Sequence, residues 1–146
     1  MWFAAFLASI AVFAAAQGPP LPGPKDRCAV CGMFVAKYPN WVATIVYADG
    51  SHRFFDGPKD LFRYLVGEGD SATVDAEIWV TDYYTTKPIK AREAVFVAGS
   101  DVLGPMGAEL IPLATIDLAE SFRVDHGGAD VLTFDRVDEA VLRSLE

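Results

Sequence analysis

Cysteine and histidine are scarce in this 146-residue chain, which has two of each. The sequence contains no H-E-x-x-H, no G-x-S-x-G and no glycine-rich phosphate loop, so the common signatures of zinc proteases, serine hydrolases and nucleotide-binding proteins are absent. It has one Cys-x2-Cys pair and no H-x3-5-H, whereas a closed structural zinc site needs four ligands and is commonly built from two such pairs. The sequence therefore does not indicate a hydrolase, a nucleotide-binding protein or a common zinc module.

Basic residues are also in the minority. There are 12 Lys and Arg against 20 Asp and Glu, which gives a formal net charge of −8 at pH 7. An acidic surface repels the phosphates of nucleic acids and anionic membranes and is compatible with attracting cations. We therefore expect no nucleic-acid partner, and no motif indicates a small-molecule substrate.

The first 16 residues carry no charge. Met1–Ala16 is almost wholly apolar, and it is shorter than the ~20 residues of a membrane-spanning helix. It ends in three alanines, which resemble an A-x-A cleavage site. We predict a secretory signal over residues 1–16, a Pro/Gly-rich tether over 17–27, and a protein located in the periplasm or another extracytoplasmic space. The first charged side chain is Lys25, so an upstream start codon or an uncleaved N-terminal anchor stays open. The signal has no cysteine, so we expect no lipid anchor.

The first half of the remaining chain predicts a hairpin, a helix and a strand. Residues rich in β-branched and aromatic side chains flank a D-G turn, which is typical of a β-hairpin. Asp56 precedes an amphipathic run and is expected to cap its N-terminus. The predicted elements are strands over Trp41–Tyr47 and His52–Phe55, a helix over Lys59–Leu65, and strands over Glu77–Tyr84 and Ala94–Ala98.

The second half shows a related order of elements. Met106 lies in a glycine-flanked turn, as Met33 follows Gly32, and an extended segment and a short helix come next. Later segments parallel the first half: Val131–Asp135 matches Arg53–Asp56, with Asp135 as a second cap, and Val137–Leu145 matches Lys59–Leu65. We predict an α+β fold made of two related ββαβ-type units, over residues 28–92 and 93–146.

The segment Cys28-Ala29-Val30-Cys31-Gly32-Met33 carries the most chemical information. It holds both cysteines and a thioether within six residues, and thiolate and thioether sulfur are soft donors that select soft metals such as Cu(I). Met106 is the other methionine beyond the initiator. Both lie in turns, whereas methionine that fills a core is expected on a helix or strand face. We therefore predict a Cu(I) site with Cys28, Cys31, Met33 and Met106 as ligands.

The two histidines have different prospects as ligands. His126 precedes two glycines in a tight turn and is included as an auxiliary ligand, while His52 lies on a predicted strand and is interpreted as a surface residue. Two other uses of the cysteines stay open. They could cycle in a thiol–disulfide oxidoreductase, although such motifs usually follow a strand and begin a helix, or they could clip a loop in a scaffolding protein.

Several segments together resemble the NosL family of nitrous-oxide reductase accessory proteins. The resemblance is carried by DRCAVCGMFVAKYPNWVATIVYADG, FFDGPKDLFRYL, VTDYYTTKPIKAREAVFVAGSDVLGPMGAELIP and DHGGADVLTFD. It implies two small ββαβ units, with Cys28, Cys31 and Met33 in the first sulfur cluster, Met106 as the second-half methionine, and His126 in a family His-Gly-Gly turn.

The resemblance also implies a function. Family members are similar in being exported, non-enzymatic copper-binding proteins of denitrification. We therefore expect a periplasmic metallochaperone that captures Cu(I) and delivers it to the copper–sulfur centre of nitrous-oxide reductase, with that enzyme and its membrane-associated assembly proteins as partners. Many members are lipoproteins whose signal ends at a cysteine, and this sequence departs from them there.

Overall fold

The computed structural model describes residues 18–69 and 71–146. The signal predicted for residues 1–16 lies outside this part of the chain. Within it, no helix has both the length and the apolar composition needed to cross a membrane. Helices combine with antiparallel sheets, which confirms the α+β prediction.

The first half forms a four-stranded antiparallel sheet in the order β2-β1-β3-β4. The predicted hairpin is present, because Val46 of β1 pairs with His52 of β2 across the Asp49-Gly50 turn. The strands are β1 (Ala43–Val46), β2 (His52–Phe55), β3 (Glu77–Thr81) and β4 (Pro88–Lys90). The short 3-10 helix η1 (Val35–Lys37) precedes β1, and helix α1 (Pro58–Gly67) and the 3-10 helix η2 (Ser71–Thr73) lie between β2 and β3.

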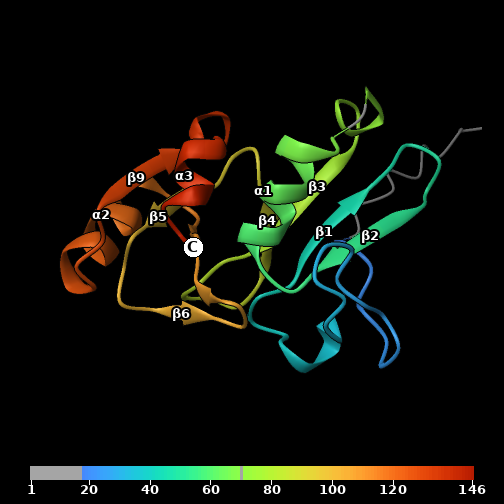
Figure 1. Cartoon of the computed structure of the whole chain (residues 1–146), viewed down its shortest axis with the longest axis horizontal. Helices are drawn as coiled ribbons and strands as arrows, with labels where there is room; N and C mark the ends of the chain where they lie inside the picture. Colours follow the sequence, from blue (N-terminus) through green and yellow to red (C-terminus); the bar gives the residue numbers. More distant parts are fainter. Residues whose placement is uncertain (1–17, 70) are drawn as a thin grey trace, which may run out of the picture.

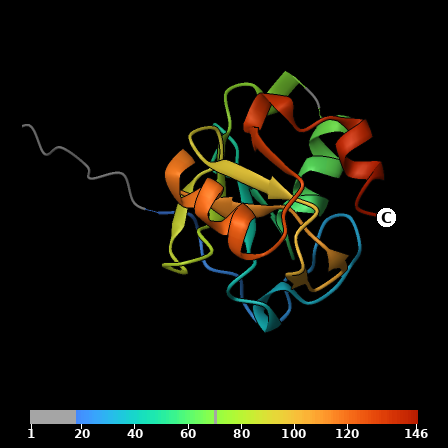
Figure 2. The same ribbon diagram turned by 90° about the vertical axis from the view of Figure 1, so that its left-hand side faces the viewer.

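The second half forms a three-stranded antiparallel sheet in the order β8-β5-β9. Helix α2 lies over its outer face (Figure 2). The elements are β5 (Val95–Ala98), the hairpin of β6 (Leu103–Gly104) and β7 (Gly107–Ala108), β8 (Ile111–Leu113), α2 (Ile116–Asp125), β9 (Asp130–Thr133), η3 (Phe134–Arg136) and α3 (Glu139–Arg143).

The same topology occurs in both sheets. In each half the first strand is central, the second strand and the strand after the helix flank it, and all neighbours are antiparallel. By this equivalence β5, β8, α2 and β9 correspond to β1, β2, α1 and β3. The sequence-based matching of Val131–Asp135 with Arg53–Asp56 was therefore wrong, since β9 takes the place of β3, and α3 has no counterpart in the first unit.

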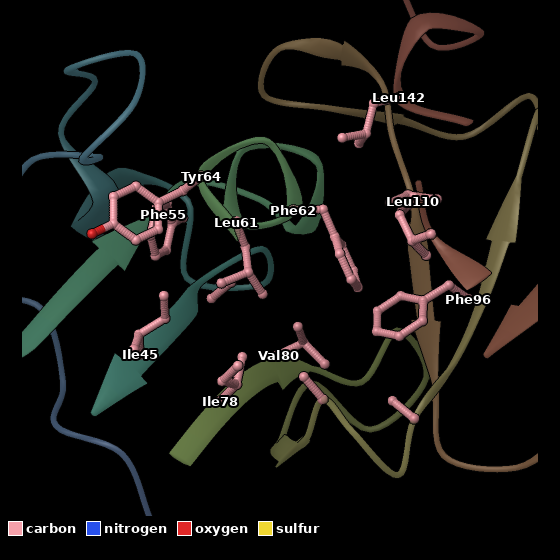
Figure 3. Packing of buried hydrophobic residues seen from close by; sticks show 14 of the residues in the cluster. Ile45, Phe55, Leu61, Phe62, Tyr64, Ile78, Val80, Phe96, Leu110 and Leu142 are labelled. Carbon is pink, nitrogen blue, oxygen red and sulfur yellow. The ribbon is translucent and has the colours of Figure 1, made fainter. Parts of the chain in front are cut away.

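Strand β5 connects the two cores. Its alternate side chains enter different clusters: Val95 and Val97 face α2, while Phe96 and Ala98 join the larger core around α1. Figure 3 shows Phe62 of α1 directed toward Phe96, with ring centroids 5.1 Å apart in an edge-to-face arrangement. Figure 1 shows α1 and α3 between the two sheets, so the larger core is built from both halves.

Two predicted helix caps were wrong. The N-cap of α1 is Gly57, which has no side chain to cap with, and Pro58 follows at the first helical position, where a missing N–H costs nothing. The last helix is capped by Asp138, whose side chain accepts a hydrogen bond from the Val141 N–H, so Asp135 has no such role. Asp56 is thereby free for another function.

Candidate metal centre

The cysteine-bearing segment forms a tight loop fixed to the end of β2. Within the loop the Cys28 N–H donates to the Met33 carbonyl over 2.8 Å. Gly32 has φ +77, a left-handed conformation that glycine adopts without steric cost. The Ala29 N–H donates to the Phe54 carbonyl over 3.0 Å. These bonds direct both thiols toward the start of α1.

Two aspartates meet the thiols there. The Cys31 thiol donates to Asp56 with 3.1 Å between Sγ and Oδ2, and the Cys28 thiol donates to Asp60 with 3.4 Å between Sγ and Oδ2. One potential ligand atom from each of the four residues lies within 4.8 Å of all the others. Asp56 and Asp60 are each 1% exposed and Cys28 is 4% exposed, while Cys31 is partly exposed. We call these four residues the thiol–carboxylate cluster.

Burial governs the protonation of this cluster. Desolvation raises the pKa of the Cys28 thiol and strongly raises that of the Cys31 thiol, and the hydrogen bond to the Asp56 carboxyl raises the latter further. Burial likewise raises the pKa of Asp56. Asp60 is paired with Arg63, with 3.1 Å between Nη1 and Oδ1. Both thiols are therefore protonated at neutral pH in the metal-free protein.

The donor set fits a bound cation. Oδ1 of Asp56 is buried and has no hydrogen-bond partner among the described residues, and such an orphaned oxygen costs free energy unless a proton or cation satisfies it. Exchanging two thiol protons for a metal ion would use the same four side chains. The two sulfurs favour a soft ion such as Cu(I), while the carboxylates add negative charge and oxygen donors at the same point.

The two methionines belong to different segments of the chain. Met33 closes the cysteine loop through its carbonyl, whereas Met106 occupies the turn between β6 and β7 and is 42% exposed. The Lys59 ammonium donates to the Met106 carbonyl over 2.9 Å, which holds the Met106 turn next to the first turn of α1, where Asp60 lies. The ligand roles of both thioethers stay predictions.

The histidines lie outside the thiol–carboxylate cluster. His126 follows the last turn of α2, where its ring stacks on Phe122 with centroids 4.3 Å apart and its Nδ1 lies 2.9 Å from Oδ1 of Asp101. His52 lies on β2 with its ring 4.8 Å from that of Phe54. The auxiliary ligand role of His126 stays a prediction that this arrangement does not support.

Sequence reasoning missed the two carboxylates. Asp56 was assigned to a helix cap and Asp60 was not singled out. A signal did exist: side chains four residues apart lie on the same face of a helix, and the F-F-D-G-P-K-D segment sets two aspartates four residues apart around its start. The spacing alone did not show that the cysteine loop, some 30 residues earlier, would meet them.

The chain resembles known copper proteins over most of its length. The NosL family model matches residues 22–142. The copper-binding lipoprotein NosL of Stutzerimonas stutzeri is 31% identical over 127 residues, which cover 82% of this chain and 65% of that protein. The chain thus spans less than two thirds of that relative.

A solved structure has the same fold. The crystal structure of the copper chaperone NosL from Shewanella denitrificans superposes with a TM-score of 0.72 at 26% identity, covering 84% of this chain and 96% of that one. The chain therefore belongs to the NosL family.

Proposed function

We propose that this protein is an exported Cu(I) chaperone, and the observation that carries the proposal is the thiol–carboxylate cluster. Two thiols converge on one point beside an oxygen of Asp56 that has no hydrogen-bond partner in the described part of the chain. The relatives are a copper-binding lipoprotein and a copper chaperone, which supports copper as the cargo of this chain. Membership of a family of binding proteins supports a role in binding and transfer without turnover.

The proposed oxidation state of the copper follows from the chemistry of the ligands. Thiolates and thioethers favour Cu(I), and Cys31 is partly exposed, so a receiving protein has access to one sulfur. We propose Cys28 and Cys31 as the principal ligands, with Met33 and Met106 as further sulfur donors and His126 as the weakest candidate. The recipient we propose is nitrous-oxide reductase in the periplasm, reached together with its membrane-associated assembly proteins.

The thiol–disulfide oxidoreductase alternative has less support. Reactive cysteines in such enzymes have lowered pKa values and lie at helix N-termini. Here burial raises the pKa of both thiols, and the cysteines lie in a turn outside the regular helices of the described chain. The pair is poorly suited to attack a disulfide at neutral pH.

The test is an anaerobic titration of the reduced protein with Cu(I) in competition with a chromophoric Cu(I) chelator. We expect one high-affinity Cu(I) per chain, which is lost in the Cys28→Ser/Cys31→Ser double variant and kept in a matched Ser51→Ala/Ser144→Ala surface control. A parallel titration with Zn²⁺ tests the preference for a soft ion. Undiminished stoichiometric binding in the double cysteine variant would refute the site.

Delivery needs a separate test. Copper-loaded protein is mixed with metal-free nitrous-oxide reductase, and copper in each is measured after separation. We expect transfer from the loaded chaperone to exceed transfer from an equal amount of chelated Cu(I). Equal transfer from both sources would leave copper binding standing and overturn the proposed recipient.

A further inference from the structure

The segment from Asp56 to Asp60 has two sides with different partners. Asp56 and Asp60 accept hydrogen bonds from the two cysteine thiols. Of the three residues between them, Gly57 and Lys59 instead contact the part of the chain around the β6–β7 hairpin. One turn of chain therefore joins the thiol–carboxylate cluster to the second half of the protein.

Glu109 supplies the cap that α1 lacks. Gly57 at the N-cap has no capping side chain, and the Glu109 carboxylate accepts the Lys59 N–H over 2.6 Å and the Leu110 N–H over 2.8 Å, both at Oε1. Glu109 is 50 residues away from the helix that it caps and is 3% exposed. The cap thus fixes the start of α1 to the chain that follows β7.

Lys59 makes the reciprocal contacts. Its side-chain ammonium donates to the carbonyls of Met106 over 2.9 Å and Ala108 over 2.6 Å, and the residue is 3% exposed. A buried lysine is rare unless its charge is satisfied, and here two backbone carbonyls accept hydrogen bonds from the ammonium. The backbone and side chain of Lys59 therefore hold the turn of the hairpin, strand β7 and the residue after it.

Two glycines let the parts approach this closely. A Cβ on Gly57 would collide with Oε2 of Glu109, and a Cβ on Gly104 would lie 2.9 Å from Cγ of Glu109. These separations are too short for ordinary contacts, so either substitution would displace the carboxylate or the hairpin. We call Gly57, Lys59, Gly104 and Glu109 the joint.

We propose that Lys59 and Glu109 are positioning residues: they hold the β6–β7 hairpin, and with it Met106, against the helix turn that carries the acidic residues of the metal centre. This inference rests on the proposed function. Lys59 and Glu109 are not proposed to bind the metal themselves. They fix the backbone of the Met106 turn and so set where the Met106 thioether can reach. Partners that orient ligands in this way typically change metal affinity about ten- to a hundredfold when removed.

The test is a double-mutant cycle on Cu(I) affinity. Glu109→Ala is expected to weaken Cu(I) binding about tenfold or more, and Glu109→Gln, which keeps an accepting oxygen, to restore part of the loss. In a Met106→Leu background the same Glu109→Ala change is expected to have no further effect, because the thioether that it positions is gone. Glu93→Ala, which removes an exposed glutamate, is the matched control.

A second pair of variants guards against misfolding of Glu109→Ala. Gly104→Ala crowds the joint, whereas Gly67→Ala, near the other end of α1, meets nothing within 4 Å. We expect weaker copper binding from the first only. An equal loss from Glu109→Ala with and without Met106, or unchanged affinity in Glu109→Ala and Gly104→Ala, would overturn the positioning role.

A measurement on the metal-free protein separates this inference from the proposed function. Hydrogen exchange at the Lys59 amide and peroxide oxidation of Met106 are both expected to accelerate in Glu109→Ala, while oxidation of Met33 stays unchanged. If the wild-type protein fails to bind Cu(I), the proposed function is wrong. The exchange and oxidation rates would still show whether Glu109 holds the Met106 turn against α1. Unchanged exchange and oxidation rates would overturn the joint itself.

Discussion

The Cys31 thiol and the Asp56 carboxylate are hydrogen-bonded, with 3.1 Å between Sγ and Oδ2. The other oxygen of Asp56 is buried, and no described residue forms a hydrogen bond with it. The carboxylate precedes α1 yet leaves the capping of that helix to Glu109. The position of the Asp56 carboxylate is therefore explained by the hydrogen bond that it accepts from the Cys31 thiol and by the candidate metal site that the two side chains share.

Removing the charge of Asp56 is expected to make Cys31 more reactive. Burial is the main reason why the pKa of Cys31 is raised, and the Asp56 carboxyl raises it further. In Asp56→Asn the pKa falls, and each unit gives about tenfold more thiolate at a pH below the pKa. The rate of iodoacetamide alkylation of the metal-free protein between pH 7 and 10, followed by mass spectrometry, measures this.

Asp49→Asn is the control for that experiment. Asp49 is an exposed carboxylate bound to Ser51 in the hairpin turn, so its loss should leave Cys31 unaffected. A rate in Asp56→Asn that equals or falls below the wild-type rate would contradict the assigned role of Asp56.

Glu109 is expected to make the protein less stable as the pH rises. Burial raises the pKa of Glu109 from 4.5 to about 8, although the Leu110 and Lys59 N–H groups and the Lys59 charge act the other way. Between these values the unfolded chain loses the proton and the folded protein keeps it. The free energy of unfolding therefore falls by up to about 1.4 kcal/mol per pH unit across the window.

Urea unfolding of the reduced, metal-free protein at pH 5 and at pH 8 measures this dependence. Glu109→Gln cannot ionise, so its stability should differ less between the two pH values. Burial also raises the pKa of Asp56, which leaves a smaller slope of the same sign in the variant. A slope in Glu109→Gln equal to that of the wild type would show that Glu109 does not titrate in this window.

Local patterns predicted most of the secondary structure. β-branched and aromatic residues located β1, β2 and β3, and apolar spacing located α1, because these signals depend only on near neighbours in the sequence. The soft-donor loop was found for the same reason, since Cys28, Cys31 and Met33 lie within six residues.

Long-range contacts explain what the sequence did not reveal. The cysteine loop reaches the aspartates only because it bridges to Phe54 at the end of β2, and the cap of α1 comes from Glu109, 50 residues away. A carboxylate before a helix is usually a cap, so the local rule pointed Asp56 to the wrong role. The glycine that does occupy the N-cap is needed because Glu109 fills the adjacent space.

Phe62 is expected to hold the two halves together. Its ring lies 5.1 Å from that of Phe96 and 5.1 Å from that of Phe134, both in the second half, and it is 2% exposed. Phe62→Ala should lower the free energy of unfolding by about 3–5 kcal/mol, while Val66→Ala, on the exposed side of the same helix, should change it by less than about 1 kcal/mol.

Denaturant unfolding followed by tryptophan fluorescence and by far-UV circular dichroism checks this, because a shared core predicts one coincident transition. Two separate transitions in the wild-type protein, or a small effect of Phe62→Ala, would show that the halves are independently stable.

Copper binding is expected to release protons. Both thiols are protonated at neutral pH because burial raises their pKa values, and a thiol must lose its proton to bind a metal. Each Cu(I) bound at pH 7 should therefore release about two protons, and affinity should rise with pH. Calorimetric titration in buffers of different ionisation enthalpy counts the protons.

Copper binding to the Cys31→Ser variant should release about one proton, and binding to the Ser51→Ala variant, which is changed away from the site, about two. Release close to zero in the wild-type protein would mean either that the thiols do not bind copper as thiolates, which contradicts the proposed site, or that they are already ionised, which contradicts the buried, carboxylate-paired state assigned to Cys28 and Cys31.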